Sequence, residues 1–110
     1  MKYSIVQLLN FAAEWRRHKL TDADLQSLEM TLMTSPGAGA SMGGGLRKIR
    51  YAAPSRHSGK SGSFRICYAW FPAHGVIALI TMFAKNEKAN LLKAEVKEIA
   101  THLKWLESTL

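Results

Sequence analysis

Apolar positions near the start of the chain recur at the spacing of helices. Residues 3–7 alternate weakly and predict a short strand, and the pattern that follows, with Ala12 and Trp15 on one side, is helical. Thr21 predicts the start of a second helix, because its hydroxyl can cap the helix while Asp24, three residues later, completes a capping box. The apolar stripe of this second helix consists of Leu25, Leu28, Leu32 and Met33.

The middle of the chain changes to the pattern of strands. Residues 46–52, 64–71 and 76–84 are rich in β-branched and aromatic residues and predict three strands, the last two joined by a turn at 72–75. The loop at 54–62 predicts another hairpin before them. The Gly-rich stretch 35–45 is expected to be a flexible connector without regular structure, because glycine entropy and proline geometry oppose it.

Residues 90–106 predict a final helix, capped by Asn90. Its apolar face would consist of Leu92, Val96, Ile99, Leu103 and Leu106. The predicted order is β-α-α-β-β-β-α. This order favours an α+β fold, in which two N-terminal helices and a C-terminal helix cover one face of a small, mostly antiparallel sheet. With 110 residues, we expect one domain spanning 1–110.

Positive charge is concentrated in the middle of the sequence. The net charge is +7, and no Asp or Glu occurs between Glu29 and Glu87. That interval holds seven cations, which equal the whole excess: Arg47, Lys48, Arg50, Arg56, Lys60, Arg65 and Lys85. Protein surfaces that serve solubility alone usually mix positive and negative charges. This uniformly basic segment therefore favours a nucleic-acid partner over a role in solubility alone.

Several other classes of site and location are disfavoured by the sequence. The longest apolar run, 76–84, is too short to span a membrane, and the first residues lack a secretory signal, so a cytoplasmic protein is expected. Gly59-Lys60-Ser61 lacks the spacing and the following helix of a phosphate-binding loop. Cys67 lies in an apolar run and is expected to be a packing residue rather than a nucleophile. The four histidines, His18, His57, His74 and His102, show no metal-ligand spacing and are expected to be exposed, so neither a metal nor a cofactor is predicted.

Strand alternation predicts where the central cations point. Lys48 and Arg50 share one face of their strand, while Arg47 shares the other with Ile49. On the next strand, Arg65 has the opposite parity to the bulky residues that are expected to face the helices. Lys48, Arg50 and Arg65 are therefore predicted to lie together on the open face of the sheet, with Lys85 approaching from the exit of the last strand.

Three motifs follow one another in the basic segment and just after it: Gly44-Gly45-Leu46-Arg47-Lys48-Ile49-Arg50, Gly59-Lys60-Ser61-Gly62-Ser63-Phe64-Arg65-Ile66-Cys67-Tyr68 and Lys85-Asn86-Glu87-Lys88. With these motifs the chain resembles the RelE superfamily of toxins from type II toxin–antitoxin systems, particularly its HigB-like branch. The resemblance covers roughly residues 21–107. It implies a microbial-RNase-like sheet and metal-independent endoribonuclease activity against mRNA on the ribosome, which inhibits translation. It also implies three partners: mRNA, ribosomal RNA and a cognate antitoxin encoded beside the toxin, expected to be a helix-turn-helix protein.

The resemblance also assigns expected roles to residues. The catalytic set would be Lys48, Arg50, Arg65 and Lys85, and further RNA contacts would come from Arg47, Arg56 and Lys60. The best-known RelE members place an Arg and a Tyr after the last strand, where this chain has Asn86 and Leu92. Tyr68 could replace the missing tyrosine, but its parity favours a core position.

The expected chemistry needs no further group. Lys48 is the candidate general base, because neighbouring positive charges disfavour its protonated form. Arg65 would grip phosphate oxygens with its planar fork, and Arg50 or Lys85 would compensate the leaving oxygen.

Two other functions stay open at the level of sequence. One is a ParE-like toxin that inhibits gyrase on the same fold, which would not need the Lys48, Arg50 and Arg65 cluster. The other is a non-catalytic basic module that binds nucleic acid, for which the same patch suffices. An antitoxin could dock on the 35–45 loop or near Trp15 or Trp105, although each tryptophan is individually expected in the core.

Overall fold

The residues that the structure describes form a five-stranded sheet with three α-helices, which confirms the predicted α+β class. The computed structural model describes residues 3–55 and 63–110. Along the chain, the elements are β1 (Ser4–Gln7), α1 (Leu9–Arg17), α2 (Asp22–Thr34), β2 (Ala40–Gly43), β3 (Leu46–Ala52), β4 (Ser63–Phe71), a 3-10 turn at Pro72–His74, β5 (Val76–Ala84) and α3 (Lys93–Thr109). The strand order is β1-β5-β4-β3-β2, in which β1 is parallel to β5 and the other neighbours are antiparallel. No helix in the described ranges is long and apolar enough to cross a membrane.

The predicted capping box fixes the start of α2. The Asp24 amide donates to Thr21 Oγ1, and the Thr21 amide donates to Asp24 Oδ2, both at 3.0 Å. These two bonds satisfy backbone donors that the first helical turn leaves without partners. Leu28 and Leu32 of the predicted stripe are buried, as expected.

The prediction that 35–45 has no regular structure is wrong, because residues 40–43 form strand β2 on the edge of β3. Tyr68 holds the approach to this strand: its hydroxyl accepts from the Gly39 amide at 3.0 Å and donates to the Pro36 carbonyl at 2.7 Å. A Cβ at Gly39 would lie 2.8 Å from the Tyr68 hydroxyl, so glycine is needed here for close approach. Tertiary contacts to a buried tyrosine thus override the low strand propensity of this segment.

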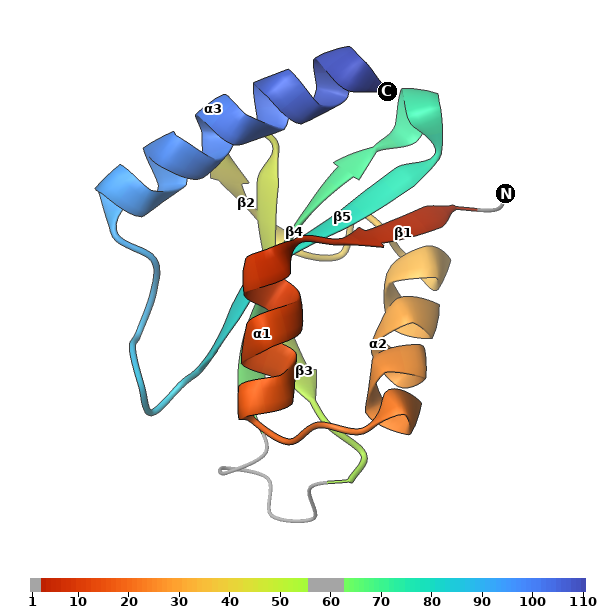
Figure 1. Cartoon of the computed structure of the whole chain (residues 1–110), viewed down its shortest axis with the longest axis vertical. Coiled ribbons are helices and arrows are strands. Elements are labelled where there is room, and N and C mark those ends of the chain that lie inside the picture. The colour runs from red at the N-terminus through yellow and green to blue at the C-terminus, as the bar shows by residue number, and fades with distance from the viewer. Residues whose placement is uncertain (1–2, 56–62) are drawn as a thin grey trace.

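The helices lie on both faces of the sheet, which corrects the prediction that one face carries them all. Helices α1 and α2 pack with Phe11, Trp15, Leu28 and Leu32 on the face that holds Tyr68. Helix α3 crosses the other face, where Leu103 packs with residues such as Leu46, Ala69 and Ile80. Figure 1 shows α1 and α2 side by side and α3 alone across the other end of the molecule. The physical reason is that β4 and β5 are apolar on both faces, so both faces need a cover.

Helix α3 begins at Lys93, three residues after the predicted cap at Asn90. The Glu95 carboxylate accepts from the Leu92 amide at 2.8 Å and fixes the new start, while Asn90 Oδ1 accepts from the adjacent Leu91 amide at 2.9 Å. Trp105, which was expected in the core, is 67% exposed on this helix, whereas Trp15 is buried as expected. The later start leaves residues 85–92 as a connection between β5 and α3, which lies beside the cationic part of the sheet.

Candidate active site

Three predicted cations lie on one face of β3 and β4, as strand alternation predicts. Arg50 stands directly opposite Arg65 in the antiparallel register, and Lys48 stands opposite Cys67, one pair further along. The pairs share the face that α3 partly covers, since Leu46 and Cys67 belong to the core beneath that helix. The cations therefore lie beside the covered part, in a more enclosed place than the open face that the sequence predicts.

Arg65 has the most unusual environment of these residues. Its side chain is half-buried, and its Nη1 atom is buried without a hydrogen-bond partner within 3–55 and 63–110. The neighbour on β5 is Phe83, which offers no acceptor in its side chain, and the neighbour on β3 is another arginine, Arg50. A buried donor without a partner costs folding free energy, and like charges directly opposite on two strands add to that cost. Such an arrangement is typical of a site that binds an anion.

A second part of the site lies between Arg50 and Lys85. Both line a hollow of about 430 Å³ together with Ser63 and Asn86. The Arg50 Nε donates to the Ser63 hydroxyl at 2.9 Å, which directs the guanidinium toward the start of β4. Lys85 directly follows β5 and is exposed, so the walls of the hollow carry one cation from β3 and one from the segment after β5.

The turn that carries Lys85 and Asn86 is fixed by Glu87. One oxygen of the Glu87 carboxylate accepts from the Ala84 amide at 3.2 Å, and the other accepts from Arg17 at the end of α1 at 2.7 Å. His18 Nε2 lies 3.0 Å from the same carboxylate. The hydrogen bond from Arg17 is the largest influence on the Glu87 side chain and holds its pKa below the usual value. Glu87 therefore pairs with Arg17 on α1, and Lys85 makes no ion pair with a carboxylate within 3–55 and 63–110.

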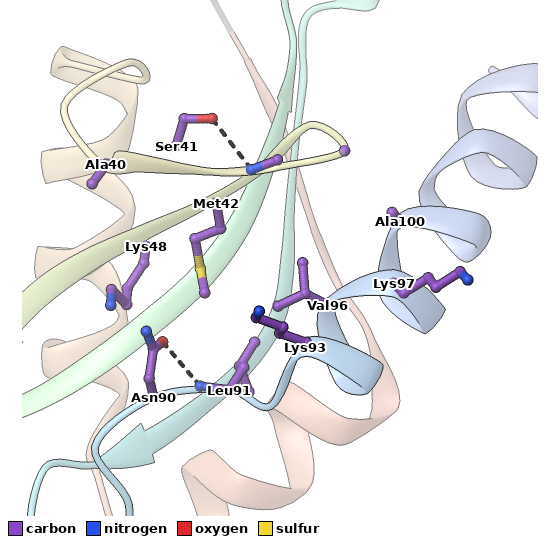
Figure 2. A pocket seen from close by; sticks show the side chains of 12 residues that line it. Ala40, Ser41, Met42, Lys48, Asn90, Leu91, Lys93, Val96, Lys97 and Ala100 are labelled. Carbon is purple, nitrogen blue, oxygen red and sulfur yellow. Dashed lines mark hydrogen bonds between the residues drawn. The ribbon is translucent and has the colours of Figure 1, made fainter.

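Lys48 lines a groove that the sequence did not reveal. The groove has a volume of about 540 Å³ and lies between the β2–β3 hairpin and the start of α3. Figure 2 shows Asn90 and Lys93 near Lys48, with the Met42 side chain between the two walls. The available signal was the spacing of 93, 96, 97 and 100, which puts these positions on one side of a helix. Many helices show this spacing, so it did not identify Lys93 as a site residue, and Asn90 lies outside it.

The remaining predicted RNA-binding residues lie elsewhere or outside the described ranges. Arg47 is on the opposite face of β3, where its Nη1 donates to the Gly39 carbonyl at 2.7 Å and to the Gly37 carbonyl at 3.2 Å. The structure thus separates Arg47 from Lys48 and Arg50 and gives it a bracing role at the entry to β2. Arg56 and Lys60 lie in 56–62, outside the described residues, so their roles stay predictions.

Other candidate chemistries find little support in the described residues. Cys67 is fully buried, and burial raises the pKa of its thiol to about 11, which disfavours the nucleophilic thiolate. Tyr68 is also fully buried, which confirms its predicted core position. His74 and His102 are exposed as expected, but His18 is half-buried against Glu87. No group of three or more metal-ligating side chains occurs within 3–55 and 63–110.

The geometry favours recognition of a polyanion by cations from β3, β4, the segment after β5 and α3. Lys48, Arg50, Arg65, Lys85 and Lys93 make no ion pair with any carboxylate of the described chain. In a partly enclosed site, guanidinium and ammonium groups without counter-ions can bind phosphate oxygens and stabilise negative charge that develops on them.

Comparisons with known proteins agree with this fold. The family model described as the RelE toxin of the RelE/RelB toxin–antitoxin system matches residues 4–109. A doubly substituted E. coli RelE in the free state is 20% identical, with a TM-score of 0.55 over 80% of this chain and 88% of that one. A chain from the crystal structure of the intact E. coli RelBE toxin–antitoxin complex is 23% identical, with a TM-score of 0.51 over 73% of this chain and 93% of that one.

A second structure of isolated E. coli RelE is 19% identical, with a TM-score of 0.52 over 88% of this chain and 95% of that one. At these identities the solved structures support the shared fold, while the family model covers nearly the whole sequence. This chain therefore belongs to the RelE toxin family of toxin–antitoxin systems.

Proposed function

We propose that this toxin is an endoribonuclease that cleaves mRNA on the ribosome and thereby inhibits translation. The observation that carries the proposal is Arg65, whose buried Nη1 has no hydrogen-bond partner among the described residues and which lies directly opposite Arg50 on the neighbouring strand. A phosphate group between these side chains would satisfy the donor and neutralise the like charges. Membership of the RelE family supports mRNA as the source of that phosphate.

Cleavage can proceed through the ribose 2′-hydroxyl next to the scissile phosphate. Lys48 is our candidate base, which removes the hydroxyl proton as the oxygen attacks phosphorus. The Arg65 guanidinium holds the non-bridging oxygens, whose charge grows in the transition state, and Arg50 or Lys85 stabilises the leaving 5′-oxygen until it takes a proton from water, to which Lys48 then releases its own. The products are a 2′,3′-cyclic phosphate and a 5′-hydroxyl. This donor set consists of cations, so the proposed reaction uses side chains rather than a metal ion.

Expression of the toxin followed by mapping of cellular mRNA ends tests this proposal. We expect new ends at a fixed position within codons, because a ribosome presents mRNA to a bound nuclease in register. Double-strand DNA breaks with intact mRNA would instead identify a gyrase-directed toxin. Intact mRNA and intact DNA would identify a non-catalytic binding protein, and either result would refute cleavage.

An antitoxin partner is also proposed, by analogy with the RelBE complex. The exposed Trp105 stays a candidate docking position, whereas Trp15 is buried and is withdrawn. A ligand at about 100 times its Kd stabilises the folded state by about 2.7 kcal/mol. For a domain of this size that corresponds to a rise in Tm of about 10 °C.

Thermal melting with the product of the adjacent gene checks this expectation. An unrelated helix-turn-helix protein at the same concentration serves as the control and should leave the Tm unchanged. The proposed pairing fails if saturating amounts of the neighbouring gene product also leave the Tm unchanged.

A further inference from the structure

The groove between the β2–β3 hairpin and α3 has two walls of different chemistry. One wall is the hairpin, from which Met42 enters the groove, and the other is the first turns of α3 with Val96 and Lys93. At one end, the hairpin touches the helix: Gly44 has a φ of +61°, and a Cβ there would lie 2.4 Å from the Ala100 Cβ. Glycine at this position therefore lets the hairpin approach α3 and sets the width of the groove.

The groove is continuous with the candidate active site through Lys48. Lys48 lines the groove, and Arg50 is two residues further on the same strand and the same face. Residues separated by two along a strand are about 7 Å apart, because each residue advances the strand by about 3.3–3.4 Å. One polymer chain can therefore contact Arg50 and Arg65 with one phosphate and enter the groove with the next nucleotide.

The polar groups in the groove match a nucleotide. Lys93 is exposed and makes no ion pair with any other described residue, so its ammonium group is available to a phosphate. The Asn90 side chain accepts from the Leu91 amide through Oδ1, which leaves the two N–H donors of its amide toward the groove. Donors of this kind pair with acceptors on the edge of a nucleobase.

The apolar part of the groove suits the face of a base. Met42 lies half-buried between the walls, and Leu91 and Val96 contribute further apolar surface. A methionine sulfur makes favourable contacts with aromatic rings, and single-stranded RNA exposes its bases for such contacts. None of the described residues that line this groove carries a carboxylate, so the groove lacks the counter-ion that a basic peptide segment would need.

We propose that this groove is a subsite for the nucleotide next to the scissile phosphate, with Lys93 on the backbone and Asn90 and Met42 on the base. The inference rests on the proposed function, because it takes RNA as the substrate. It assigns binding to three residues that the catalytic chemistry does not use. The groove then selects the RNA segment that reaches Lys48, Arg50 and Arg65.

Salt-dependent binding of a single-stranded oligoribonucleotide tests the role of Lys93. The probe carries a 2′-O-methyl group on every ribose, so that no 2′-hydroxyl can attack and cleavage cannot occur, and binding is followed by fluorescence anisotropy. We expect Lys93→Gln to lower the slope of log K against log salt by about 0.7, the value of one phosphate contact on a single strand. Lys104→Gln, an exposed lysine on the same helix outside the groove, should leave the slope unchanged. An unchanged slope in Lys93→Gln, or no measurable binding by the wild-type protein at low salt, would overturn the proposal.

Paired probes with and without a base test Asn90. We expect Asn90→Ala to bind the complete probe about two- to tenfold more weakly, as for the loss of a hydrogen bond, and to bind an abasic probe as the wild type does. An equal loss on both probes contradicts a base contact. Because these are binding measurements, they fail independently of the mRNA-end experiment: codon-phased ends with unchanged Lys93→Gln and Asn90→Ala binding would keep the nuclease and remove the subsite.

Discussion

Arg65→Ala should cleave mRNA about ten- to a hundredfold more slowly than the wild type, or slower still. The guanidinium contributes one or two charge-assisted hydrogen bonds to phosphate, each worth about 1.5–3 kcal/mol. If these bonds form mainly in the transition state, each 1.4 kcal/mol that is lost lowers the rate about tenfold. The measurement is the rate of cleavage of ribosome-bound mRNA by purified protein, together with growth inhibition in cells.

The same substitution should leave stability unchanged or raise it. Arg65 carries a buried donor without a partner and stands opposite Arg50, so its removal relieves a desolvation cost and a like-charge contact. Arg65→Ala should therefore unfold at the same or a higher urea concentration than the wild type. A variant that stays fully toxic would exclude this face as the active site.

Ile66→Ala is the matched control on the same strand. Ile66 is fully buried on the opposite face, among the residues beneath α1 and α2. Removal of its side chain should cost about 2–5 kcal/mol of folding free energy, since it leaves a cavity in the core. The pair separates two effects: Arg65→Ala loses activity and keeps stability, while Ile66→Ala loses stability through the core.

Strand alternation explains why the central part of the site could be predicted. The period of two in β3 and β4 determines which side chains share a face, and both strands have clear apolar partners for one set. Arg50 and Arg65 then come together because the hairpin register pairs them directly. These relations are local in sequence or follow from one hairpin, so no knowledge of distant packing was needed.

The groove could not be predicted because it depends on packing between distant segments. The position of α3 on the second face follows from the need to cover β4 and β5 on both sides, which a pattern within α3 cannot reveal. Likewise, β2 forms because Tyr68 anchors residues 36 and 39, which lie about thirty residues earlier. Lys93 and Asn90 line the groove only because α3 lies on the second face of the sheet and β2 forms beside β3.

A buried carboxylate on the face of the sheet that α1 and α2 cover connects α2 to the segment after β3. Asp24 is 1% exposed, and its carboxylate accepts from the Ser55 amide at 3.0 Å, from the Ser55 hydroxyl and from the Thr21 amide. The backbone carbonyl of the same residue accepts from the Tyr51 hydroxyl at 2.6 Å. Asp24 therefore fixes the start of α2 and the residue that immediately precedes the basic segment 56–62.

Asp24→Ala should lower the free energy of unfolding by about 2–5 kcal/mol at pH 7, because it leaves several donors without an acceptor. Burial raises the pKa of Asp24, but the hydrogen bonds from Ser55 and Thr21 outweigh it and leave the pKa below its usual value. The stabilising contribution is thus fully present above the unfolded pKa of about 3.9 and is lost as the pH falls through the lower folded value. Urea unfolding should show a large difference in unfolding free energy between wild type and Asp24→Ala at pH 7, and this difference should narrow below about pH 4.

Asp22→Ala is the control, because it removes an exposed carboxylate from the same helical turn. It should cost about 0.3–1 kcal/mol through the helix dipole. A gap for Asp24→Ala that is small, or that persists unchanged in acid, would show that the ionised carboxylate does not hold these two segments together.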